Sequence, residues 1–379
     1  MTSQEAPAVL GGDQGSSDRP VGRTWLQTAA LITAFGCSCA ALIVAFVGLS
    51  QFDLPIVRYV RSVTIHLPWN QLTVPWMAFT SDAGDWIGEG THLVAVSVGL
   101  LAVGWFFSQA TVKAAGIQTL LAHGLAALVV NGLKHLIGRP RPKFAHSGEW
   151  QLAPSWASGL DSFPSGHSAA SFAVATVLAK RFPAVGPLCL GIAAFVALSR
   201  ILRGSHFPTD VFGGAVVGVL SGAIAGAPLK QWRTSLRHGI QQAAMGASMA
   251  LALLWALSRP VEEGIIGALF IGLGLAVTAS GLWLRRTEWI GNDTSGASRQ
   301  ATLSSILIVY GLASLTTSFY VVSAVGLACV AIAFNRAAAR EEEQHHHTRT
   351  WLVMRESALL GAVMLALLIL YDGRSVLPF

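Results

Sequence analysis

The feature that most constrains this chain is a series of long apolar stretches. A helix needs about 20 apolar residues to cross a bilayer, and about eleven stretches approach that length. Only 12% of the 379 residues are charged and 53% are hydrophobic, whereas soluble domains carry about 25% charged residues. We therefore expect an all-α fold, a polytopic transmembrane helical bundle. The stretches are 25–49, 91–107, 114–137, 166–181, 184–202, 209–228, 239–257, 264–284, 301–317, 319–334 and 356–371.

The distribution of Lys and Arg predicts an orientation. Cytoplasmic loops of membrane proteins carry an excess of these residues. With the N-terminus inside, every predicted inner segment is basic, and the C-terminus lies outside. Two predicted outer segments, 134–143 and 199–210, are also rich in cations, which indicates an anion-binding site there. The inner cations are Arg19, Arg23, Lys113, Lys180, Arg181, Lys230, Arg233, Arg237, Arg285, Arg286, Arg299, Arg336, Arg340, Arg349 and Arg355.

The composition along the chain divides it into three parts. Residues 1–24 are polar and predict a disordered cytoplasmic tail. Residues 25–235 hold a six-helix core, and residues 236–379 hold about five further membrane helices to which the sequence assigns no role. Aromatic residues and prolines in 50–90 predict either short interfacial helices or an irregular loop on the outer side.

Three polar clusters lie at predicted outer helix ends. The first is Lys134 followed after six residues by Arg141-Pro142. The second is Pro164-Ser165-Gly166-His167, directly before a helix, and the third runs from Ser199-Arg200 to His206 and Asp210 between two helices. Because all three face the same side, a bundle is expected to bring them into one pocket.

These residue types suit a phosphate group. The guanidinium groups of Arg141 and Arg200 can bind phosphate oxygens in pairs, and Lys134 adds a point charge. The helix that starts at Ser165 and Gly166 offers free N–H groups to an anion. Fixed cations of this kind stabilise the charge that spreads over phosphate oxygens during phosphoryl transfer.

The two histidines supply the reactive groups. A neutral imidazole such as that of His206 is a good nucleophile, and Asp210, four residues later, can fix its tautomer. His167 from the opposite side can protonate the leaving oxygen. A phosphohistidine then forms and is hydrolysed by water. No carboxylate cluster suited to Mg²⁺ or Zn²⁺ lies nearby in the sequence, so we expect a metal-independent reaction without cofactors.

The three clusters resemble the signatures of the type 2 phosphatidic acid phosphatase superfamily, K-x6-R-P, P-S-G-H and S-R-x5-H-x3-D, and each is complete. The resemblance covers roughly residues 50–230. It implies that His206 is the nucleophile, His167 the general acid and Asp210 the orienting partner of His206. It also implies a set of phosphate binders: Lys134, Arg141, Ser165, Gly166 and Arg200.

The resemblance predicts an integral-membrane lipid phosphatase whose partner is a lipid phosphate in the bilayer. Phosphatidic acid, phosphatidylglycerol phosphate and undecaprenyl diphosphate are the expected substrate classes, and the oligomeric state is left open. We expect a bacterial inner-membrane protein with its site on the periplasmic face. Nucleic acid is not an expected partner, because no basic stripe with interleaved aromatic residues is present.

Two other hypotheses remain open at this stage. Vanadate-dependent haloperoxidases share this pocket, although those relatives are soluble. A non-enzymatic role, with the extra helices acting as a lipid transporter or partner-binding unit, would survive the loss of His206.

Outside the clusters, structural roles are expected. The four cysteines predict apolar packing, and His123 predicts a neutral, hydrogen-bonded side chain within a helix. The segment EEEQHHH at 341–347 and the sequon at 292–294 fall in predicted inner loops. Three further cations are expected to be solvated loop charges: Arg139, Lys143 and Arg203.

Overall fold

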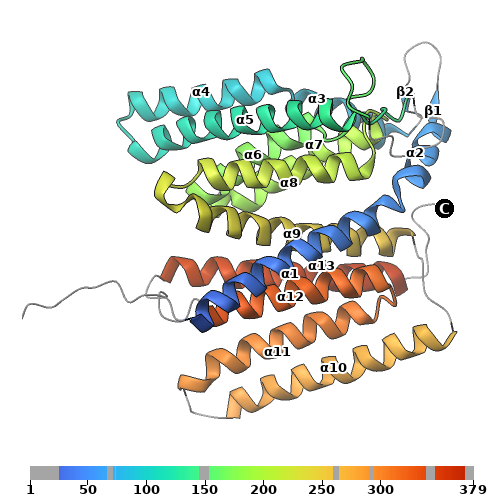
Figure 1. The fold of residues 1–379 in the computed structure, drawn as a ribbon, viewed down its shortest axis with the longest axis vertical. Coiled ribbons are helices and arrows are strands. Elements are labelled where there is room, and N and C mark those ends of the chain that lie inside the picture. Colours follow the sequence, from blue (N-terminus) through green and yellow to red (C-terminus); the bar gives the residue numbers. More distant parts are fainter. Residues whose placement is uncertain are drawn as a thin grey trace, which may run out of the picture.

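The described part of the chain is almost entirely helical (Figure 1). The structure, a computed structural model, describes residues 25–65, 71–72, 74–144, 153–258, 264–290, 294–338 and 346–371. The predicted tail, residues 1–24, lies outside these ranges. The α-helices are α1 (Trp25–Ser50), α2 (Asp53–Ser62), α3 (Pro75–Ile87), α4 (Gly90–Phe106), α5 (Ala110–Ile137), α6 (Gly166–Arg181), α7 (Gly186–Leu202), α8 (Pro208–Ala225), α9 (Trp232–Ser258), α10 (Gly264–Ile290), α11 (Thr294–Ser314), α12 (Phe319–Ala338) and α13 (His346–Tyr371).

Short elements connect some of these helices. Two 3₁₀ turns, Pro183–Val185 and Leu229–Gln231, precede α7 and α9. Strand β1 (Thr64–Ile65) pairs antiparallel with β2 (Gln71–Leu72), so that Thr64 lies opposite Leu72. The helices predicted within 50–90 are present as α2 and α3. Helix α3 packs along α7.

Each predicted apolar stretch coincides with a helix, which confirms the all-α polytopic fold. Within the described residues, seven helical segments are long and apolar enough to cross a membrane, and α3 with α4, bent by 53° at their junction, would make an eighth. The predicted number of about eleven is larger because α6 has 16 residues and the apolar parts of α11 and α13 are short.

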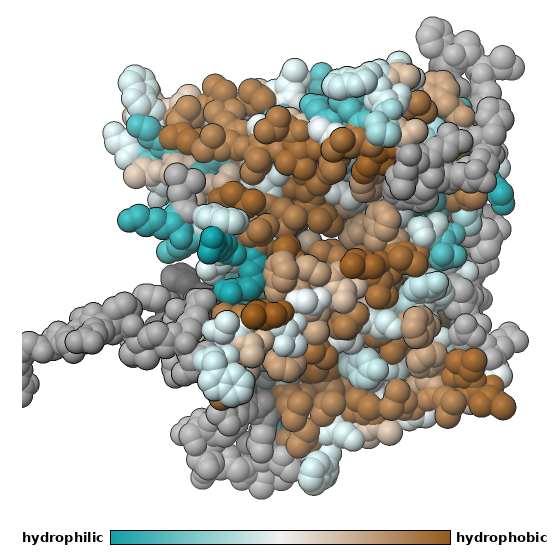
Figure 2. Space-filling model, viewed as in Figure 1, coloured by the Kyte–Doolittle hydropathy of each residue, from teal (hydrophilic) through white to brown (hydrophobic). Residues whose placement is uncertain are grey.

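The outer surface of the bundle is apolar. Large hydrophobic side chains point outward from several helices, including Ile265 in α10 at 81% exposure and Leu128 in α5 at 72%. Figure 2 shows hydrophobic residues spread over the middle of one face. Water would solvate such a surface poorly, whereas lipid tails match it. The chain is therefore an integral membrane protein.

The helices form two groups that meet along α8 and α9 (Figure 1). Helices α3 to α8 make one group, and α9 to α13 make the other. Helix α1 belongs to the predicted core 25–235, but it packs chiefly against α12 and α9. Its buried face joins the largest apolar cluster through Ala45 and Leu49, next to Leu251 of α9 and Val325 of α12.

Small residues draw α8 against α6. A Cβ atom at Gly214, Gly218 or Gly222 would lie 2.4–2.6 Å from a carbonyl oxygen of α6 or of Ser165. Close contact of this kind is typical of small-residue faces between membrane helices. It brings the N-termini of α6 and α8 together, and the amide of Ser165 donates a 2.9 Å hydrogen bond to the carbonyl oxygen of Asp210. The fold thus places the second and third clusters side by side.

Candidate active site

Lys134 lies in the last turn of α5, which ends at a left-handed glycine. Gly138 has φ +61°, and its amide donates a 2.9 Å hydrogen bond to the carbonyl of Lys134. A Cβ atom at Gly138 would lie 1.8 Å from the carbonyl oxygen of Ala153, so only glycine fits here. The chain turns sharply at this point and carries Arg139 and Arg141 back over the ends of α6 and α8.

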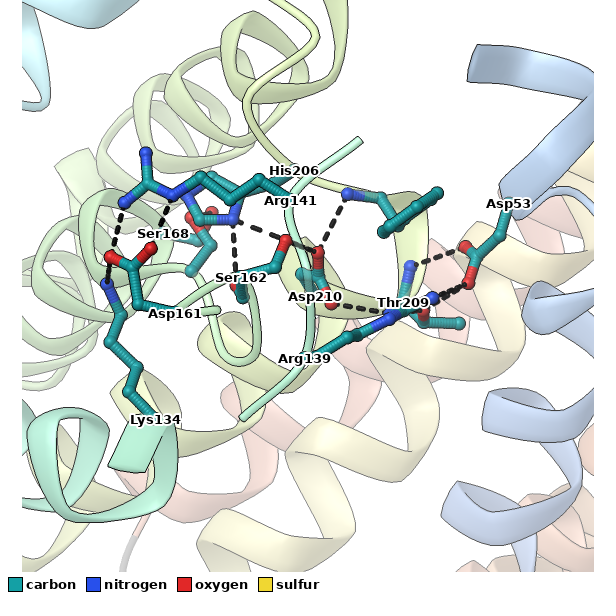
Figure 3. A network of polar contacts seen from close by, with 12 residues as sticks. Asp53, Lys134, Arg139, Arg141, Asp161, Ser162, Ser168, His206, Thr209 and Asp210 are labelled. Carbon is teal, nitrogen blue, oxygen red and sulfur yellow. Dashed lines mark hydrogen bonds and ion pairs between the residues drawn. The ribbon is translucent and has the colours of Figure 1, made fainter. Parts of the chain in front are cut away.

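Arg141 and Lys134 share one carboxylate (Figure 3). Nε and NH2 of Arg141 donate hydrogen bonds of 2.8 and 2.6 Å to the two oxygens of Asp161. Nζ of Lys134 lies 3.6 Å from Oδ2 of Asp161. The hydrogen bonds from Arg141, together with its charge and that of Lys134, lower the pKa of Asp161 to about 2. Asp161 was not among the predicted site residues.

His206 is buried in the turn between α7 and α8, with 3% of its surface exposed. Its Nδ1 lies 2.8 Å from the carbonyl oxygen of Ser162 and 3.8 Å from Oδ2 of Asp210. A carbonyl oxygen only accepts hydrogen bonds, so Nδ1 carries the proton and Nε2 keeps its lone pair. Burial lowers the pKa of His206, although the contact with Asp210 opposes this shift.

Asp210 is thus the second neighbour of the His206 ring, because the Ser162 carbonyl oxygen makes the shorter contact with Nδ1. The Asp210 carboxylate accepts hydrogen bonds from Ser162 Oγ at 2.5 Å and from the Phe207 amide at 2.8 Å. The sequence predicted the pair of His206 and Asp210 but not the role of Ser162. The reason is that Ser162 contacts His206 through its backbone oxygen, which any residue type would supply.

Arg139 corrects one sequence expectation. It is 1% exposed and is therefore not a solvated loop charge. Its NH1 donates hydrogen bonds to Asp210 Oδ1 at 2.5 Å and to Thr209 Oγ1 at 2.8 Å, and its NH2 donates one to Asp53 Oδ2 at 2.9 Å. Two buried carboxylates stabilise the buried cation (Figure 3). Asp53 lies 86 positions earlier in the chain, so local sequence carries no signal for this contact.

His167, at the start of α6, and Arg200 of α7 both contact the carboxylate of Asp85. Nε2 of His167 lies 3.5 Å from Oδ1 of Asp85, and NH1 of Arg200 donates a hydrogen bond to the same oxygen. Arg200 is 6% exposed, and its Nε has no hydrogen-bond partner among the described residues. Ser165, fully buried, accepts a 3.1 Å hydrogen bond from Ser168 Oγ.

His167 lines two cavities. The first has a volume of about 160 Å³ and is mainly apolar, with Lys134, Gly166 and His123 among its lining residues. The second, of about 540 Å³, is polar and lies beside α3 and Arg203. Nδ1 of His123 has no hydrogen-bond partner among the described residues, contrary to the expected hydrogen-bonded histidine.

The structure brings the predicted site residues to one end of the α5–α8 group. Lys134 and Arg141 meet at Asp161, His167 and Arg200 meet at Asp85, and His206 packs beside Asp210. In the described part of the chain, no group of three His, Cys, Asp or Glu residues is placed to hold a metal ion. Residues 341–345 and the sequon asparagine lie outside the described ranges.

Comparisons with known proteins agree with this geometry. The model of the PAP2 superfamily matches residues 115–232, which hold all three clusters. A lipid A 1-phosphatase from Rhizobium johnstonii is 37% identical over 95 residues, 24% of this chain and 39% of the relative. An undecaprenyl-diphosphatase from Bacillus subtilis is 35% identical over 135 residues, 34% of this chain and 65% of the relative.

Coverage is greater for a third relative. A phosphatidylglycerophosphatase B from Bacillus subtilis is 32% identical over 157 residues, 38% of this chain and 72% of the relative. The chain spans about two fifths of the length of the two lipid A 1-phosphatases from Rhizobium. No solved structure matches the chain significantly. The match across most of the Bacillus relative, together with the three clusters at one site, shows that this chain belongs to the PAP2 superfamily.

Proposed function

We propose that this protein is a metal-independent phosphatase that hydrolyses a phosphomonoester or diphosphate on a membrane lipid through a phosphohistidine. The observation that carries the proposal is the setting of His206. Its Nδ1 is bound by the Ser162 carbonyl beside Asp210, which leaves Nε2 as a nucleophile. The relatives named as phosphatases of lipid substrates support the same reaction class.

The phosphate group binds between the cations of the site. Arg141, Lys134 and Arg200 supply positive charge, and the start of α6 at Ser165 and Gly166 supplies N–H groups. In the structure these cations pair with carboxylates, Arg141 and Lys134 with Asp161 and Arg200 with Asp85. The incoming phosphate replaces these carboxylates as the partner of the cations. The free energy of phosphate binding is therefore reduced by the free energy needed to break the internal ion pairs.

The first chemical step transfers the phosphoryl group to His206. Nε2 attacks phosphorus, the bond between phosphorus and the lipid oxygen breaks, and protonated His167 donates its proton to that oxygen. The products are a phosphohistidine and the lipid alcohol, or the lipid monophosphate when the substrate is a diphosphate. The positive charge that develops on the His206 ring is stabilised by Asp210, whose Oδ2 lies 3.8 Å from Nδ1.

The second step returns the enzyme to its starting state. Neutral His167 accepts a proton from water, the water oxygen attacks phosphorus, and the bond between phosphorus and Nε2 breaks. Inorganic phosphate leaves, and His167 is again protonated for the next substrate. Neither step needs a metal ion, because the arginine and lysine side chains neutralise the charge of the phosphate oxygens.

The apolar cavity beside His167 suggests where the lipid product lies. The apolar cavity of about 160 Å³ is lined in part by residues of α5 and α6 and suits the first carbons of a lipid alcohol. We assign the substrate to the phosphatidic acid, phosphatidylglycerol phosphate or undecaprenyl diphosphate class. The site would lie on the periplasmic face of a bacterial inner membrane, following the charge distribution of the loops.

Release of inorganic phosphate from a panel of these lipids tests the proposal. The purified protein, in detergent with EDTA, should release phosphate from at least one of them. His206→Ala should lower turnover by about 10⁴-fold or more, as expected for removal of a nucleophile. His135→Ala is the matched control, because this imidazole stacks on Trp156 in the outer loop.

A trapping experiment separates the mechanism from the reaction class. With a ³²P-labelled substrate, acid-labile and base-stable label should appear on the wild-type protein and be missing from His206→Ala. Activity that requires added divalent metal would contradict the proposed mechanism, and so would normal turnover by His206→Ala.

A further inference from the structure

A carboxylate that belongs to none of the three clusters contacts the proposed proton donor. Asp85, in the last turn of α3, accepts a hydrogen bond from Arg200 NH1, and the same oxygen lies 3.5 Å from Nε2 of His167. Its second oxygen lies 3.3 Å from NH1 of Arg203. Helix α3 precedes residues 115–232, which match the family model, so Asp85 is outside the matched region.

The packing of α3 against α7 holds Asp85 in this position. A Cβ atom at Gly84 would lie 2.4 Å from Cβ of Ser199, and one at Gly88 would lie 2.3 Å from Cγ1 of Val196. Without these side chains the two helices approach closely, which places Asp85 beside Arg200. The contact is therefore set by the backbone arrangement of two packed helices.

The charges around His167 leave Asp85 as its direct anionic neighbour. Lys134 shares the apolar cavity with His167, and Arg200 contacts the same oxygen of Asp85 as His167 does. Asp161, another carboxylate of the site, has its ion pairs with Lys134 and Arg141 among the described residues, and none with His167. A ring surrounded by cations would lose its proton, whereas a general acid must hold it until the leaving oxygen takes it.

We propose that Asp85 is a positioning residue that directs His167 at the leaving oxygen of the substrate and favours the protonated form of its ring. This inference rests on the proposed phosphatase function. When the substrate phosphate binds Arg200, the Asp85 carboxylate gives up that hydrogen bond and remains next to His167 and Arg203. The second cavity, lined by Asp85, His167 and Arg203, gives the carboxylate room to move.

The dependence of the rate on the leaving group tests this role. An alkoxide leaving group needs a proton from the general acid, whereas p-nitrophenolate leaves well without one. Asp85→Asn keeps the shape of the side chain and removes its charge. It should lower kcat on phosphatidic acid by about 10- to 100-fold and on p-nitrophenyl phosphate by about twofold at most, in the same detergent.

Two further variants separate this role from a general structural effect. Asp82→Asn is the matched control, because Asp82 lies on the same helix and its side chain is 81% exposed. Its carboxylate pairs with Arg203 at 3.5 Å. It should behave like the wild type on both substrates. Asp85→Glu restores the charge and should recover part of the lost activity on the lipid.

The outcomes distinguish this inference from the proposed function. Equal losses on both substrates in Asp85→Asn would overturn the inference, since a role in phosphate binding or stability affects both. Unchanged rates in Asp85→Asn would overturn it as well. If the wild-type protein releases no phosphate from any substrate, the proposed function itself fails and the inference fails with it.

Discussion

Arg139 and Asp210 form an ion pair that ties the third cluster to the N-terminal part of the chain. NH1 of Arg139 lies 2.5 Å from Oδ1 of Asp210, and both side chains are buried. The other end of the guanidinium binds Asp53 of α2 at 2.9 Å, and Oδ2 of Asp53 also accepts a 2.5 Å hydrogen bond from Thr209. The position of Asp210 beside His206 therefore depends on a helix that precedes the family match.

Replacement of Arg139 should destabilise the protein strongly. Arg139→Leu would leave the carboxylates of Asp53 and Asp210 buried without their cation, at a cost of about 3–5 kcal/mol. The midpoint of thermal unfolding in detergent should fall clearly below that of the wild type. Lys143→Leu is the control, because Lys143 is exposed in the same loop. Equal midpoints for the two variants would contradict the structural role of Arg139.

Removal of the Asp161 charge should strengthen phosphate binding. Asp161 pairs with Arg141 and Lys134, and Asp161→Asn would free both cations for an anion. Because this ion pair is partly exposed, the inhibition constant of inorganic phosphate should fall by only about two- to fivefold. Inhibition assays at constant ionic strength measure it. A weaker affinity would mean that Asp161 orients the cations for phosphate and does not compete with it.

The acid side of the pH–rate profile should report His206. Burial lowers the pKa of this imidazole below its usual value of about 6.5, so the ring is neutral at pH 7. As the pH falls through that pKa, the ring becomes protonated and can no longer attack phosphorus. The acid limb of kcat/KM should therefore have its midpoint below pH 6.5. A midpoint above this value would show that the buried imidazole is not the titrating nucleophile.

The end of α5 should tolerate no side chain at Gly138. Gly138→Ala combines a left-handed backbone, which costs about 1–2 kcal/mol for other residues, with a contact of 1.8 Å to the Ala153 carbonyl. We expect lower thermal stability and a higher KM, because Lys134 lies in the adjoining turn. Gly132→Ala on the same helix has open space around its Cβ atom and should leave both quantities close to the wild type. Similar behaviour of the two variants would refute this account.

Much of the architecture was predictable from the sequence. The apolar stretches predict each membrane helix because hydrophobic length is a local property, and each stretch coincides with a helix. The three clusters predict the site residues for a related reason, since the spacing of Lys134 from Arg141 and of His206 from Asp210 is fixed along the chain. The predicted meeting of the clusters followed from helix direction alone, and the structure places them together.

The partners of these residues could be decided only by the tertiary structure. Asp85, Asp161 and Asp53 lie in segments without a motif. Asp85 and Asp53 reach the site because helices distant in sequence pack side by side, whereas Asp161 reaches it from the loop between α5 and α6. Arg139 looks like any loop cation until the backbone encloses it. Hydropathy and spacing describe one segment at a time, whereas the pairing of buried charges depends on which segments become neighbours, and that is settled by packing.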